Sequence, residues 1–91
     1  MRFKRIIFMG TPDYATTIFK EILENNYNII ALFTQPDKSV GRSKELKFPH
    51  IKQFTLDNNF NIPIYQPKSL KDVSTIKTIK DLNPDMIIVA A

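Results

Sequence analysis

The sequence contains no cysteine and only two glycines among its 91 residues. Without cysteine, the chain can form neither a disulfide nor a thiolate metal site, and no other spacing typical of metal ligands is present. Two glycines are too few for the dinucleotide-binding fingerprint, because that motif uses three glycines for a tight turn, close approach of the pyrophosphate and helix packing. The lack of cysteine fits a reducing compartment, so we expect a cytoplasmic protein without a bound metal.

Long apolar runs are also missing. No run approaches the roughly 20 residues needed to cross a bilayer, and the apolar stretch near the N-terminus is too short for a signal peptide. We therefore expect no membrane association. With 43% apolar residues, the chain can bury a modest core, either as one small domain or as part of a larger one. Its net charge of +4 permits a polyanionic partner without demanding one.

The first ordered feature is an apolar run at residues 6–9, which has the composition of a parallel strand covered on both faces. Gly10 follows and is suited to turning the backbone. We then predict that Thr11 caps a helix with its hydroxyl and that Pro12 takes the first helical position. Asp13 would favour the positive end of the helix dipole. This spacing is equally compatible with a simple connector and with a ligand site, since ligands bind at the carboxyl ends of strands in open α/β sheets.

The apolar pattern continues as alternating strands and helices. The first helix ends at Asn25 and Asn26, and its predicted buried stripe consists of Tyr14, Ala15, Ile18, Phe19, Ile22 and Leu23. Further strands are predicted over residues 28–34, 62–65 and 85–91, and further helices over residues 49–58 and 73–82. Pro63 places the third strand at an edge, because proline cannot donate to a ladder. The order strand, helix, strand favours a parallel crossover and an α/β fold class.

The last predicted strand is wholly apolar. Such a strand should be flanked by another strand and covered on both faces. We therefore expect residues 1–91 to be the N-terminal part of a larger domain.

A basic segment follows the second predicted strand. Residues 35–49 show no apolar periodicity, and a connection of this length is usually functional or disordered. Its cations are Lys38, Arg42, Lys44 and Lys47, and Glu45 lies among them. Composition alone favours a solvated surface charge run, whereas the functional alternative is that these cations follow nucleic-acid phosphates.

Four motifs in this order resemble the N-terminal segment of the methionyl-tRNA formyltransferase family. They are Phe8-Met9-Gly10-Thr11-Pro12-Asp13, Thr34-Gln35-Pro36-Asp37-Lys38 with Gly41-Arg42, Lys44, Leu46 and Pro49, Ile62-Pro63-Ile64-Tyr65-Gln66-Pro67 with Leu70, and Leu82-Asn83-Pro84-Asp85 continuing to Ala91. Each motif alone is weak, but the four together at these spacings are specific. The resemblance covers nearly the whole chain.

The resemblance implies a Rossmann-like parallel sheet of the formyltransferase type, with helices on both faces and incomplete in this chain. It implies transfer of a formyl group from formyltetrahydrofolate to the α-amino group of methionine on initiator tRNA. In the family an Asn, a His and an Asp carry out catalysis, and they match nothing in this chain. We therefore expect no catalytic residue here, the main folate-binding residues beyond Ala91, and a monomeric full-length protein.

The resemblance also assigns binding residues. The wall of the active-site cleft would include Gly10, Thr11, Pro12 and Tyr14. The tRNA-contacting loop would include Lys38, Gly41, Arg42, Lys44 and Lys47. Arg42 is the strongest candidate, because arginine can contact a phosphate bidentately or stack on an unpaired base. Tyr14 has an ordinary alternative role as the start of the buried helix stripe.

Other polar residues have simpler interpretations. His50, the only histidine, lacks an evident orienting carboxylate, so we expect a surface or capping role. Turn and cap roles are expected for Asp37, Asp72, Asp81 and Asp85.

Two alternative functions stay open at this point. One is a folate-dependent formyltransferase acting on a small-molecule amine, such as a sugar nucleotide or a glycinamide ribotide. The other is a non-catalytic nucleic-acid-binding module.

Overall fold

The computed structural model of the chain describes residues 5–42 and 45–91. Its main element is a parallel sheet of four strands in the order β5-β2-β1-β6. The strands are β1 (Ile6–Gly10), β2 (Ile29–Phe33), β5 (Ile64–Tyr65) and β6 (Met86–Ala90). The chain therefore runs outward from β1 through β2 to β5, and then returns to place β6 on the other side of β1. This order confirms the predicted Rossmann-like α/β sheet.

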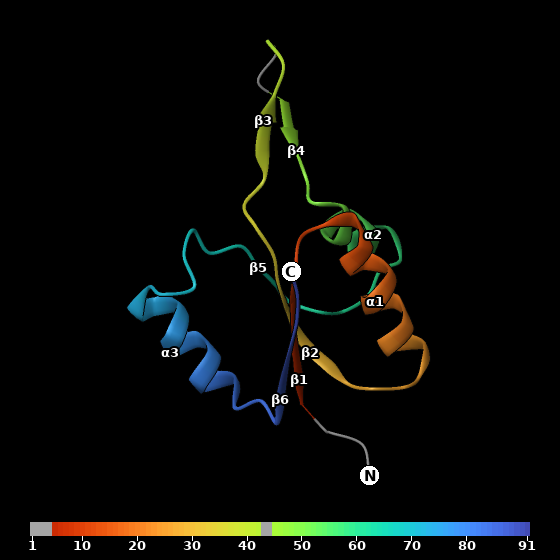
Figure 1. The fold of residues 1–91 in the computed structure, drawn as a ribbon, viewed down its shortest axis with the longest axis vertical. Coiled ribbons are helices and arrows are strands. Elements are labelled where there is room, and N and C mark those ends of the chain that lie inside the picture. Colours follow the sequence, from red (N-terminus) through yellow and green to blue (C-terminus); the bar gives the residue numbers. More distant parts are fainter. Residues whose placement is uncertain (1–4, 43–44) are drawn as a thin grey trace.

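Helices cover both faces of the sheet (Figure 1). On one side lie α1 (Asp13–Glu24) and α2 (His50–Asp57), and on the other lies α3 (Val73–Leu82). The helices end where asparagine adopts a left-handed conformation, with φ of 64° at Asn26, 55° at Asn59 and 49° at Asn83. The prediction that asparagine closes α1 in place of glycine is thus confirmed.

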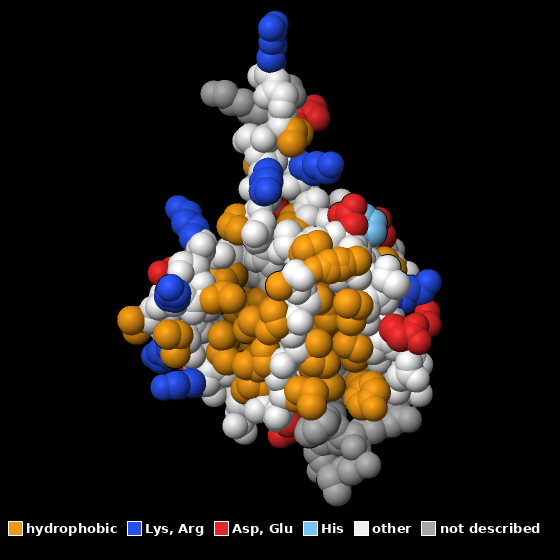
Figure 2. All heavy atoms as spheres, viewed as in Figure 1, with side chains coloured by type: hydrophobic (Ala, Val, Ile, Leu, Met, Phe, Trp, Pro, Cys, Tyr) orange, Lys and Arg blue, Asp and Glu red, His pale blue; other side chains and the backbone are white. Residues whose placement is uncertain are grey.

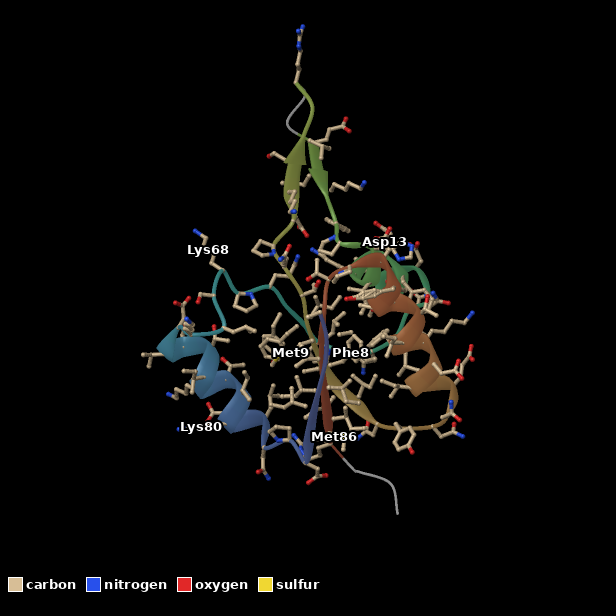
Figure 3. All side chains as sticks on the ribbon, viewed as in Figure 1. Phe8, Met9, Asp13, Lys68, Lys80 and Met86 are labelled. Atoms are coloured by element: carbon tan, nitrogen blue, oxygen red, sulfur yellow. The ribbon has the colours of Figure 1, made fainter. Side chains whose placement is uncertain are left out.

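The two faces of β1 supply two separate cores. Ile6 and Phe8 point toward α1 and α2, whereas Ile7 and Met9 point toward α3 (Figure 3). All four are buried, as expected for a central parallel strand whose successive side chains face opposite ways. On the α1 side, the Phe8 and Phe19 rings lie 5.3 Å apart between centroids.

The predicted buried stripe of α1 is only partly correct. Ala15 and Phe19 are buried in α1, as expected, and α2 buries Ile51 and Thr55. Tyr14 and Ile18, however, are 45% and 41% exposed, and Thr16 is buried in their place. The buried face of α1 is therefore rotated toward Thr16, which faces α2 and lies within hydrogen-bond distance of its His50.

The first turn corrects another prediction. Pro12, with extended backbone angles of φ −56° and ψ 153°, is the N-cap of α1, and the helix begins at Asp13. No side chain caps this helix. The Thr11 hydroxyl instead lies 3.1 Å from the hydroxyl of Thr34 and accepts a hydrogen bond of 3.1 Å from the backbone N–H of Gln35. The sequence pattern predicted that the Thr11 hydroxyl caps α1, but this hydroxyl bonds instead to the residues that follow β2.

The basic segment is an antiparallel hairpin rather than a loop without secondary structure. It consists of β3 (Lys38–Val40) and β4 (Glu45–Lys47), which project beyond the rest of the molecule (Figure 1). All residues of both strands are exposed. Because neither face of the hairpin is buried, no apolar alternation marks its strands in the sequence.

The two edges of the main sheet differ. β5 lies at one edge, as predicted, and the carbonyl of Pro63 beside it accepts a hydrogen bond of 2.9 Å from the Leu32 N–H. At the other edge, no strand of the described residues pairs with the outer side of β6. Ile87 and Val89 are 42% and 63% exposed there, and Figure 2 shows apolar side chains gathered over the middle of this face. The expectation of a flanking strand stays a prediction.

None of the helices in the described part of the chain is both long enough and apolar enough to span a membrane.

We predict that Gly10→Ala destabilises the full-length protein by about 1–3 kcal/mol, because a Cβ there overpacks a closed site. That atom would lie 2.8 Å from the Ala15 Cβ and 3.1 Å from the Ala90 carbonyl oxygen. Thermal or urea unfolding measures the change. The matched control is Gly41→Asn, where no described residue lies within 4 Å of an added Cβ and asparagine tolerates the φ of +69°. Equal stability of the two variants would contradict the steric explanation.

Candidate functional site

A cleft of about 470 Å³ opens at the carboxyl ends of β1, β2 and β6. Its lining consists of Met9, Gly10, Thr11, Pro12, Phe33, Thr34, Gln35, Pro67, Lys68, Ser69, Leu70, Val89, Ala90 and Ala91. The connection leaving β1 leads to β2 on one side, whereas β6 lies on the other side of β1. The cleft therefore lies at the topological switch point of the sheet, which is where open α/β sheets bind ligands.

The wall of the cleft is mainly apolar. Phe33, Leu70 and Val89 contribute large apolar side chains, and the Thr11 and Thr34 hydroxyls are hydrogen-bonded to each other. Among the described lining residues, the one titratable side chain is that of Lys68, which is exposed and lies on the connection between β5 and α3 (Figure 3). This lining offers a binding surface rather than a paired acid and base.

Three of the four predicted cleft residues line this cavity. Gly10, Thr11 and Pro12 do so, whereas Tyr14 lies outside the lining. The Tyr14 hydroxyl instead donates a hydrogen bond to the carbonyl of Ala91. The structure thus places Tyr14 beside the cleft, where it contacts a residue of the wall.

Three lining segments were not among the predicted site residues. They are residues 33–35, 67–70 and 89–91. Each ends or closely follows a predicted strand, and carboxyl ends of parallel strands meet at one edge of a sheet. That rule was the available signal, but it does not say which connections fold back over the opening.

The hairpin carries the predicted cations on an open surface. Lys38, Arg42 and Lys47 are all exposed, and none of them forms an ion pair within residues 5–42 and 45–91. Figure 2 shows Lys and Arg side chains along the projecting hairpin. The predicted contact residue Lys44 lies outside the described residues. Gly41 has φ of +69° at the turn, a conformation that glycine adopts without strain.

Like charges face each other across this hairpin. Lys38 pairs in register with Lys47, and Val40 pairs with Glu45. Like charges directly opposite in an antiparallel pair are destabilising. The arrangement of charge is therefore better suited to a bound polyanion than to the isolated hairpin.

The hairpin base is held by a polar cluster of Asp37, Lys52 and Gln66. The Lys52 ammonium lies 3.1 and 3.0 Å from the two Asp37 carboxylate oxygens and 2.9 Å from the Gln66 Oε1. The Gln66 amide donates to the Asp37 Oδ1 at 2.7 Å and to the Gln35 carbonyl at 3.0 Å. Asp37 is thus part of a long-range cluster, which corrects its interpretation as a turn residue.

These contacts lower the pKa of Asp37 below its ordinary value of 3.8. The hydrogen bond from the Gln66 amide is the main cause, and the Lys52 ammonium adds to it through a hydrogen bond and its charge, while partial burial opposes both. Because these contacts favour the carboxylate, they stabilise the folded state when Asp37 is ionised.

His50 is exposed at the first position of α2, as predicted. Its Nδ1 lies 2.9 Å from the hydroxyl of the buried Thr16, so the ring joins the beginnings of α2 and α1. Within the part of the chain that the structure describes, no three His, Cys, Asp or Glu side chains are grouped as metal ligands.

A parallel sheet with this strand order and a cleft at its switch point defines a ligand-binding α/β protein of the Rossmann-like class. Comparison with known families identifies it further, because the family model described as formyl transferase matches residues 4–91. The chain therefore belongs to the formyl transferase family.

Curated relatives carry a more specific name. The methionyl-tRNA formyltransferase of Campylobacter lari is 57% identical over 88 residues, which cover 97% of this chain and 29% of the relative. A Campylobacter jejuni protein of the same name is 57% identical over 89 residues, with the same coverage. That of Nitratiruptor sp. is 49% identical over 87 residues, covering 96% of this chain and 28% of the relative. The chain thus spans less than a third of the length of these relatives, and the resemblance found in the sequence is confirmed.

We predict that Asp37→Asn reduces stability at neutral pH and that this reduction shrinks in acid. A carboxyl group whose pKa is lowered on folding contributes stability above its ordinary pKa, and that contribution disappears as pH falls through the lower folded value. The stability contributed by the ionised Asp37 is therefore lost below pH 3.8. Urea unfolding of wild type and variant from pH 7 downward measures the difference. A difference that stays constant below pH 3.8 would exclude this linkage.

Proposed function

We propose that the full-length protein transfers a formyl group from formyltetrahydrofolate to the amino group of methionyl initiator tRNA. Residues 1–91 supply the first half of the sheet, one part of the cleft and the basic hairpin that contacts tRNA. The observation that carries the proposal is the 57% identity, over 97% of this chain, to a relative named methionyl-tRNA formyltransferase. The hairpin cations Lys38, Arg42 and Lys47, which form no ion pair among the described residues, support the same acceptor.

In this reaction the methionyl amine attacks the formyl carbon, and a tetrahedral intermediate with a negatively charged oxygen develops. Collapse of the intermediate breaks the bond between the formyl carbon and the folate nitrogen, which takes up a proton as the attacking amine loses one. Hydrogen-bond donors placed at the oxyanion stabilise it. The resemblance assigns these catalytic steps to an Asn, a His and an Asp beyond Ala91, so the role of the present residues is to bind and orient.

The described residues are suited to two parts of that task. The apolar walls of the cleft, with Phe33, Leu70 and Val89, can hold an apolar side chain next to the strand ends. The first strand of the hairpin, β3, begins three residues after Gln35, which itself lines the cleft. A nucleic acid bound along the hairpin would therefore reach the cleft with its end, while Lys38, Arg42 and Lys47 neutralise phosphates.

A small-molecule amine is the competing acceptor. Such an acceptor gives no reason for cations spread along a projecting hairpin, and the names of the relatives favour tRNA. Competition distinguishes the two: excess uncharged initiator tRNA should inhibit formylation of methionyl-tRNA if the hairpin binds tRNA. Formylation of a sugar nucleotide or glycinamide ribotide that tRNA does not inhibit would reject the proposal.

We predict that Arg42→Ala in the full-length enzyme lowers kcat/KM for methionyl-tRNA about tenfold and leaves thermal stability unchanged. Arg42 is exposed and makes no ion pair among the described residues, so its removal costs substrate contacts and not folding contacts. The slope of log kcat/KM against log salt should become shallower by about one, because one fewer counterion is released.

Lys80→Ala is the matched control for this experiment. Lys80 is an exposed cation in the last turn of α3, far from the hairpin (Figure 3). It should change neither kcat/KM nor the salt slope. An unchanged slope for Arg42→Ala, or an equal change for Lys80→Ala, would remove the hairpin from tRNA binding.

A further inference from the structure

The projecting hairpin has no buried face with which to fix its own orientation. Every residue of β3 and β4 is exposed, and its strands pair with each other but with no strand of the main sheet. Its orientation relative to the cleft therefore depends on the residues at its base. Those residues are Asp37, directly before β3, and Phe48, directly after β4.

The residues that flank the two strands of the hairpin contact the same ammonium group. Lys52 of α2 makes an ion pair at 3.0 Å with Asp37, which precedes β3. Its Nζ also lies 3.9 Å from the centroid of the ring of Phe48, which follows β4. The Lys52 and Asp37 side chains are only 15% and 19% exposed. A cation so shielded from water is held by its partners, and these partners lie on opposite sides of the hairpin base.

Hydrogen bonds continue from this ammonium group to the cleft. Gln66 accepts from Lys52 and donates to Asp37 and to the Gln35 carbonyl. The Gln35 N–H in turn donates to the hydroxyl of Thr11 in the cleft wall. The hairpin base and the cleft wall are thus joined by one continuous set of polar contacts.

We propose that Lys52 is a positioning residue that holds the basic hairpin at a fixed orientation to the cleft. This inference rests on the proposed function, because it assigns Lys52 the task of pre-organising the tRNA-binding surface. A hairpin that is already oriented loses little conformational freedom when tRNA binds, whereas a loose hairpin must be ordered at the expense of affinity. The Lys52 side chain is only 15% exposed and its ammonium already contacts Asp37 and Gln66, so it does not serve as a phosphate contact.

The first test is kinetic and uses Lys52→Met in the full-length enzyme. We expect KM for methionyl-tRNA to rise about tenfold and kcat to change less than about twofold, because the bound substrate and the transition state lose the same amount of binding energy. KM for formyltetrahydrofolate should stay unchanged. The salt slope should also stay unchanged, which distinguishes Lys52 from a cation that contacts phosphate.

Two variants provide the controls. Lys52→Arg keeps a cation near Asp37 and Phe48 and should restore most of the tRNA affinity, whereas Lys77→Met makes the same change at an exposed position of α3 and should have no effect. If Lys52→Met does not fold, Gln66→Leu carries the same expectation, because it removes the amide that joins Gln35 to Asp37.

The second test measures orientation without any substrate. Spin labels at Ser39→Cys on β3 and Lys80→Cys on α3, with any cysteines beyond residue 91 replaced by serine, report the distance between hairpin and body. We expect Lys52→Met to broaden this distance distribution. An unchanged width would overturn the proposal, and so would a broadened distribution with an unchanged KM for tRNA or a shallower salt slope. If the wild-type enzyme does not formylate methionyl-tRNA, the proposed function fails, and the spin-label width still decides whether Lys52 orients the hairpin.

Discussion

The structure depends on the burial of β1 on both of its faces. Ile6 and Phe8 belong to one core and Ile7 and Met9 to the other, so one five-residue strand holds α1 and α2 on one side of the sheet and α3 on the other. The same strand ends at Gly10, where Ala15 and Ala90 leave no room for a side chain. The close approach of these three elements places β1, α1 and β6 around a common point, and the cleft opens there.

The hairpin and the core of the sheet are stabilised in different ways. The sheet is stabilised by apolar burial, whereas the hairpin is stabilised by its own ladder and by a few polar contacts at its base. The exposed cations therefore remain available to a ligand. Because the hairpin base is joined through Gln66 and Gln35 to the cleft wall, the two surfaces keep a defined spacing although little apolar packing connects them.

Features that arise from local periodicity could be predicted from the sequence. The buried strands and the limits of α1, α2 and α3 follow from apolar spacing, proline and asparagine, so they match closely. Features that depend on a distant partner could not. The Thr11 hydroxyl bonds to Thr34, 23 residues away, and Asp37 bonds to Lys52 and Gln66, 15 and 29 residues away. The hairpin could not be predicted for a different reason. Its strands are exposed on both faces and therefore carry no apolar alternation.

The register of Lys38 opposite Lys47 has a thermodynamic consequence. Their mutual repulsion weakens the unliganded hairpin, and a polyanion placed along it removes that repulsion, so ligand and hairpin stabilise each other reciprocally. Simple salt acts on the two states in opposite directions. It screens the repulsion between the two lysines and so stabilises the free hairpin, while its ions compete with a polyanion for these charges. Rising ionic strength therefore weakens a complex between the hairpin and a polyanion and at the same time stabilises the hairpin without ligand.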